Sequence, residues 1–265
     1  MTNTRDVWVP LWAHAKMSEV TSTVHGAPTG TGDVVGTLWH KAVAIQAAPP
    51  SWVVLLTAAI AAVAVLGTWS WLLTRNVITF AHEGGHALAA VLTGRRLAGI
   101  RLHTDTSGVT LTVGRPSGPG MVATAAAGYL APALLGLGGA AMLAAGHAAA
   151  LLWVTLALLA LLMLQIRNFY GLVAVVGSGI AVFAVVWGAT PYLQEGFAYL
   201  LTWFLLLGSP RPVFELQARR RRGYAADSDA DQLAQLTGVP GLVWVGVFGG
   251  VTLAVLVVGA RWLIP

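Results

Sequence analysis

Long apolar runs follow one another from residue 51 to the C-terminus, and such runs must be buried in lipid or against one another. A helix needs about 20 predominantly apolar residues to cross the hydrocarbon core of a bilayer. Runs close to that length occupy residues 51–69, 76–93, 119–146, 148–166, 169–189, 193–208 and 239–263. The sequence therefore predicts an all-α polytopic membrane protein with about seven transmembrane helices. A single broken helix over 51–93 would reduce the number to six.

The composition agrees with a membrane protein and narrows its chemistry. Charged residues make up only 9% of the chain, against about 25% in a soluble domain. The chain has 0 cysteines, so disulfides and thiolate metal sites are excluded and a metal must be held by His, Asp or Glu. Although the formal net charge is +5, the arginines lie in short loops between apolar runs. We therefore expect the lipid bilayer, and no nucleic acid, as a partner.

The basic residues are distributed unevenly between the two ends of this helix arrangement. With seven helices, only Arg75 and Arg261 fall on one side, which leaves 13 of the 15 lysines and arginines on the other. Cytoplasmic loops carry such an excess. We therefore expect a multi-pass protein of the cell membrane whose N-terminus and basic loops are cytoplasmic. Residues 1–50 are expected to be a cytoplasmic, partly disordered arm, and residues 51–265 one membrane domain.

A small β-hairpin is predicted in the loop that follows residues 76–93. Alternating residues in "GIRLH" and "VTLTV" flank the turn signal "TDTSG", which places the strands at about 97–103 and 108–114. Unpaired strand edges are costly in lipid, so the hairpin should lie at the cytoplasmic interface or against protein. It serves either as a connector or as an edge that binds an extended peptide.

The polar stretch "HEGGH", residues 82–86, interrupts the second apolar run. His82 and His86 lie about 40° apart on one helix face, so both imidazoles can reach one zinc ion. Glu83 lies close to the same face, where it can take a proton from water without being a ligand. Such residues are costly within a membrane span and need a functional reason. The alternative is a proton relay or a polar clamp between helices.

Zinc needs a third protein ligand, and Asp229 is the best candidate. In "SDADQLAQLT", Ser228 can cap a short helix that has Asp229 in its first turn, on the same predicted side as the end of the "HEGGH" helix. Asp231 and Asp227 are alternatives. All three aspartates could instead form a solvated acidic cap beside the arginines at 219–222.

Two further polar residues lie on the same predicted side of the membrane. Asn168, at the start of the run 169–189, can donate a hydrogen bond to the oxyanion of a tetrahedral intermediate, as such donors do in acyl transfer. A helix cap is an equally good explanation of this asparagine. His103, in the predicted hairpin, is most simply an exposed strand residue.

With these elements the chain resembles the site-2 protease superfamily of intramembrane zinc metalloproteases, in particular its compact bacterial branch without a PDZ domain. The resemblance rests on "AHEGGHALAAVLTGRRL", "AAAGYLAPALLG", "RNFYG" and "SDADQLAQLT". It implies that His82, His86 and Asp229 bind zinc, that Glu83 activates water and that the site faces the cytoplasmic half of the bilayer. One departure is that Asp229 lies between Ser and Ala, where better-known members have "LDG".

The sequence thus predicts a zinc metalloendopeptidase that hydrolyses a peptide bond in or near a transmembrane segment of a membrane-protein substrate. The site residues are His82, His86 and Asp229 for the metal, with Glu83 and Asn168 as catalytic groups. The alternative is a non-catalytic membrane protein, either a pseudoprotease scaffold or a transporter with a His/Glu relay. The oligomeric state and the identity of the substrate do not follow from the sequence.

Overall fold

The computed structural model describes residue 36, residues 44–223 and residues 228–264. The chain divides into two units, and the description below concerns only the second, Ala42–Pro265. The helices are α3 (Ser51–Leu66), α4 (Thr68–Thr74), α5 (Asn76–Leu92), α6 (Pro119–Ala144), α7 (Ala148–Gln165), α8 (Phe169–Gly188), α9 (Pro191–Gly208), α10 (Pro210–Arg221), α11 (Asp229–Thr237) and α12 (Gly241–Leu263). The strands are β1 (Arg96–Leu102) and β2 (Gly108–Val113). Most of the arm expected over 1–50 lies outside the described residues.

Within the described residues, five helical segments are long and apolar enough to cross a membrane, or six if α3 and α4 count as one bent span. The five segments are α6, α7, α8, α12 and the continuous run formed by α9 and α10. Seven spans are therefore not confirmed, and the alternative of six agrees with the structure if α3 and α4 form one span. The "HEGGH" helix α5 has only 17 residues and carries three ionisable side chains, so it does not qualify as an apolar span by itself.

The first apolar run is not one straight helix, because it breaks at Gly67 and bends by 97° between α3 and α4. Gly67 has an extended backbone, with φ −69° and ψ 140°. A Cβ at this position would lie 2.4 Å from the Ser70 Oγ, which itself donates a hydrogen bond to the Val63 carbonyl. The break therefore depends on a residue without a side chain and on the Ser70 hydroxyl, which shares the Val63 carbonyl with the Gly67 N–H.

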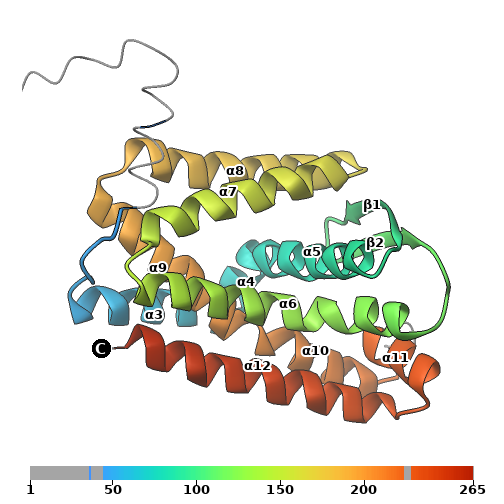
Figure 1. Cartoon of the computed structure of the whole chain (residues 1–265). Helices are drawn as coiled ribbons and strands as arrows, with labels where there is room; N and C mark the ends of the chain where they lie inside the picture. The colour runs from blue at the N-terminus through green and yellow to red at the C-terminus, as the bar shows by residue number, and fades with distance from the viewer. Residues whose placement is uncertain (1–35, 37–43, 224–227, 265) are drawn as a thin grey trace, which may run out of the picture. The chain divides into compact units, whose positions relative to one another are not determined.

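The hairpin has the antiparallel pairing that the sequence predicts, with strand ends that differ by one residue. Its first strand is also bound on the other edge, since Ile100 pairs with Ile166 and the Arg167 N–H donates to the Ile100 carbonyl at 2.9 Å. Ile100 and Leu102 are buried in an apolar cluster with side chains of α5, α7 and α8. The hairpin therefore lies between α5 and the pair α7–α8 (Figure 1).

The segment before α3 lies at the end of the helices opposite the hairpin. The Gln46 N–H donates to the carbonyl of Gly146, in the connection from α6 to α7. At the other end of α6, a Cβ at Gly120 would lie 3.2 Å from the Cβ of Thr93, which follows α5. Because α3, α4 and α5 together run antiparallel to α6, they cross the helix bundle once.

This arrangement contradicts the prediction that the chain enters its first helix from the hairpin side. The error comes from counting 51–69 and 76–93 as separate spans, whereas the break at Gly67 makes them parts of one crossing. The prediction of a cytoplasmic N-terminus falls on residues 1–35 and 37–43, outside the described part of the chain.

Candidate metal centre

Helix α5 presents His82 and His86 on one face, as the four-residue spacing predicts. Their Nε2 atoms are 3.0 Å apart, and the two rings meet edge to face with their centroids at 4.6 Å. The face lies close to α6, because a Cβ at Gly85 would be 2.8 Å from the Ala127 carbonyl oxygen. Gly85 therefore permits the close contact of the two helices, while a Cβ at Gly84 would meet no atom within 4 Å.

Helix α6 orients the His86 ring. The His86 Nδ1 lies 2.7 Å from the Thr124 carbonyl oxygen, and since a carbonyl can only accept, this nitrogen carries the proton. The His86 Nε2 then faces the His82 Nε2 at 3.0 Å. Gly128 supplies the space for this arrangement, because a Cβ there would lie 2.3 Å from the His86 Nε2 and 2.8 Å from the His82 Cε1.

Asp229 is brought to the same two nitrogens by α11. Its Oδ2 lies 3.2 Å from the His82 Nε2 and 3.3 Å from the His86 Nε2. Ser228 is the N-cap of the helix, and Ala230 and Leu233 are fully buried against α6, α10 and α12. Burial alone would raise the pKa of Asp229, but hydrogen bonds from His82 and His86 hold it below its usual range. The carboxylate form, which binds cations, is therefore favoured.

The other candidates for the third ligand lie elsewhere. Asp231 binds Arg220 and accepts a 2.6 Å hydrogen bond from the Ser228 hydroxyl, so it is the acidic cap that the sequence offered as an alternative. Asp227 lies outside the described residues. His103 follows the end of β1 in the exposed turn, where its Nδ1 is 3.2 Å from the Ser107 Oγ.

The three donor atoms fit a zinc ion in both type and spacing. Two imidazole nitrogens and one carboxylate oxygen form a group of possible ligands, and their mutual distances are 3.0, 3.2 and 3.3 Å. Bonds of about 2.0–2.1 Å to tetrahedral zinc place ligand atoms roughly 3.3 Å apart. Three protein ligands are also the usual number at a catalytic zinc site, where the fourth position stays open.

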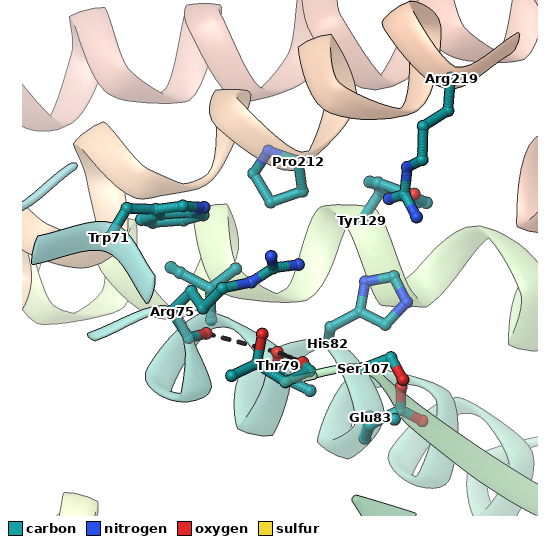
Figure 2. Close-up of a pocket in the computed structure, with 12 residues that line it drawn as sticks. Trp71, Arg75, Thr79, His82, Glu83, Ser107, Tyr129, Pro212 and Arg219 are labelled. Atoms are coloured by element: carbon teal, nitrogen blue, oxygen red, sulfur yellow. Dashed lines mark hydrogen bonds between the residues drawn. The ribbon is translucent and has the colours of Figure 1, made fainter. Parts of the chain in front are cut away.

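Glu83 is not part of this group and faces the hairpin. Only 3% of its surface is exposed, and its Oε2 accepts a hydrogen bond of 2.6 Å from the Thr110 hydroxyl. His82 and Glu83 line a pocket of about 170 Å³ together with residues of α4, the hairpin, α6 and α10. Figure 2 shows the guanidinium groups of Arg75 and Arg219 reaching into this pocket from two sides.

The side chain of Asn168 binds the backbone of β1. Its side-chain oxygen accepts from the Leu102 N–H at 3.1 Å, and its amide nitrogen donates to the Leu102 carbonyl at 2.6 Å. Asn168 occupies the N-cap position of α8, but its side chain makes no capping hydrogen bond. Both groups of the amide are thus engaged by β1, and the oxyanion role stays a prediction.

Three residues at the centre were not identified from the sequence. Thr124 acts through its backbone carbonyl, and Gly128 acts through the absence of a side chain. Neither role can be recognised from the type of residue. Tyr129 packs edge to face on His82, with the ring centroids 4.9 Å apart, and stacks on Phe248. The stretch "AAAGYLAPALLG" drew attention to this part of α6 without revealing what its residues do.

One comparison with known proteins bears on this centre. A family described as Peptidase M50B-like matches residues 55–259, which include both histidines, Glu83 and Asp229. No curated protein and no solved structure gave a significant match.

Proposed function

Because the chain belongs to the Peptidase M50B-like family, which is the site-2 protease family, we propose that it is an intramembrane zinc metalloprotease. Its reaction is hydrolysis of a peptide bond in or near a transmembrane segment of a membrane protein. One observation carries the proposal. His82 and His86 of α5 and Asp229 of α11 meet within 3.3 Å of one another, and Glu83 lines a pocket together with His82.

His82, His86 and Asp229 are the residues that would hold the zinc ion. A bound zinc ion supplies a Lewis acid that polarises a carbonyl and lowers the pKa of water to about 7. The Thr124 carbonyl keeps the His86 ring in the orientation that a ligand needs, since it fixes the proton on Nδ1.

Glu83 is the proposed general base. It accepts a proton from the water whose oxygen forms a bond to the scissile carbonyl carbon, and it passes this proton to the amine nitrogen as the C–N bond breaks. Its burial keeps bulk water away from the carboxylate and strengthens its interactions with nearby groups. Its position one residue after His82 places it beside the metal ligands without making it one of them.

A substrate helix hides its amides in internal hydrogen bonds, so it must unwind before water can attack. An extended peptide could then pair with a strand edge. Since β1 is bound on its outer edge to Ile166 and Arg167, we propose that the substrate pairs with β2. This strand passes Glu83 at Gly108 and Thr110.

The hairpin side is proposed to be cytoplasmic. Arg95, Arg96, Arg101 and Arg115 lie in or beside the hairpin, and Arg167 contacts it from the α7–α8 connection. Arg261 lies near the other end of the last span. This excess of arginine supports a cytoplasmic position for the hairpin and the metal centre.

The test is turnover of a co-expressed transmembrane substrate by the wild type and by Glu83→Gln. We expect Glu83→Gln to abolish cleavage while it retains the fold and the zinc, because both imidazoles stay in place. Chelation of the wild type should also stop cleavage, and added zinc should restore it. Full turnover by Glu83→Gln would contradict the mechanism, and a wild type that never binds zinc would favour a non-catalytic membrane protein.

A further inference from the structure

The Glu83 carboxylate is held from outside its own helix. Among the described residues, Thr110 of β2 is the one hydrogen-bond partner of its side chain, with the hydroxyl 2.6 Å from Oε2. The same hydroxyl lies 3.2 Å from the backbone carbonyl oxygen of Glu83. Thr110 therefore contacts both the side chain and the backbone of the proposed base.

Gly108, two residues before Thr110 on β2, lies against the same carboxylate. A Cβ at Gly108 would lie 2.6 Å from the Glu83 Cγ and 2.7 Å from Oε1. Residues 108 and 110 face α5, because side chains two apart on a strand share a face, while Val109 and Leu111 are exposed on the other face. Strand β2 thus contacts the Glu83 Oε2 with the Thr110 hydroxyl and leaves space for Oε1 at Gly108.

The hairpin that carries these two residues is itself anchored. The Thr79 hydroxyl of α5 donates to the Thr106 carbonyl at 2.8 Å, and Asn168 binds both backbone groups of Leu102. Figure 2 shows Thr79, Ser107 and Glu83 along one side of the pocket. The hairpin is therefore held at its turn and at the outer edge of β1, which fixes the position of Thr110. The β-branched side chain of Thr110 also has few rotamers.

From these contacts we propose that Thr110 is a positioning residue that orients the Glu83 carboxylate, a role that rests on the proposed function of Glu83 as the base. The torsion that turns a carboxylate is soft, so without a partner the plane of the carboxylate would rotate freely. The Thr110 hydroxyl donates a hydrogen bond to Oε2. The other oxygen, Oε1, lies beside Gly108 and remains available to accept the proton from water. Correct placement of a base within hydrogen-bond reach is a condition for proton transfer.

The test compares Thr110→Val, Thr110→Ser and Thr155→Val in the zinc-loaded protein. Valine keeps the shape of threonine and removes the hydroxyl, and serine keeps the hydroxyl. Thr155 of α7 is the control, since its hydroxyl donates within its own helix, to the Leu151 carbonyl at 2.9 Å. We expect Thr110→Val to lower kcat by about 10- to 100-fold with KM little changed. Thr110→Ser and Thr155→Val should stay within about threefold of the wild type.

A second readout does not depend on turnover. Thr110→Val should lower the Tm by about 3 °C when Glu83 is present and by clearly less in the Glu83→Ala background, because the partner is then gone. Equal shifts in both backgrounds would overturn the contact. Thr110→Val with wild-type kcat, or Thr110→Ser as slow as Thr110→Val, would overturn the positioning role. A wild type without zinc or without cleavage would defeat the proposed function instead, and the Tm comparison would still decide the contact.

Discussion

At the scale of single residues, the centre depends on groups that touch the histidines without binding a metal. Gly128 leaves space where a Cβ would meet His86 at 2.3 Å, and the Thr124 carbonyl accepts from the same ring. In both contacts the group that meets the ring comes from the backbone of α6 and not from a titratable side chain. Both follow from the close packing of α5 on α6, which in turn requires Gly85.

Gly128→Ala is predicted to weaken zinc binding by about 10- to 100-fold, because the new methyl group displaces the His86 ring from Asp229. Gly138→Ala is the control on the same helix, since a Cβ there meets no atom within 4 Å. Competition with a zinc chelator measures both affinities. Equal affinities in the two variants would show that the space at Gly128 is not needed.

At the scale of elements, local sequence patterns predicted where strands and helices begin, whereas the contact of Asn168 with β1 was not predicted. The alternation in "VTLTV" predicted β2, and Ser228 predicted the start of α11. A broken helix over 51–93 was the stated alternative, but the position of the break at Gly67 was not predicted, because glycine is also common within membrane helices and its effect depends on Ser70. The pairing of Asn168 with Leu102 joins residues far apart in the sequence, and no local pattern reports it.

Asn168→Ala tests what this asparagine does. It removes two hydrogen bonds to β1, so we expect the free energy of unfolding to fall by about 1–3 kcal/mol and the Leu102 amide to exchange faster with solvent. Thermal unfolding and hydrogen exchange measure these effects. A large loss of kcat with unchanged stability and exchange would restore the oxyanion role that the sequence suggested.

At the scale of the whole molecule, α3 to α5 form one crossing, so the segment before α3 and the hairpin lie at opposite ends of the helices. The sequence could not show this, because apolar length alone does not distinguish one bent crossing from two straight ones. The metal centre is assembled from α5 and α11, and α6 packs against both of these helices.

Single-cysteine labelling tests this topology in a chain that has 0 native cysteines. Ala48 precedes α3 and Ser117 follows the hairpin, and both are exposed. A membrane-impermeant thiol reagent added to intact cells should label Ala48→Cys and spare Ser117→Cys, which should react only after the membrane is permeabilised. Labelling of both from the same side would contradict the single crossing.

The most direct test of the whole account is the zinc content of Asp229→Asn beside that of Asp231→Asn, measured after brief chelation. The wild type should hold one zinc per chain. Asp229→Asn should lose it, since a charged ligand oxygen is removed from the two imidazoles. Asp231→Asn should keep it, since Asp231 binds Arg220 and Ser228 instead. Equal retention by the two variants, or loss in Asp231→Asn alone, would contradict a centre built from His82, His86 and Asp229.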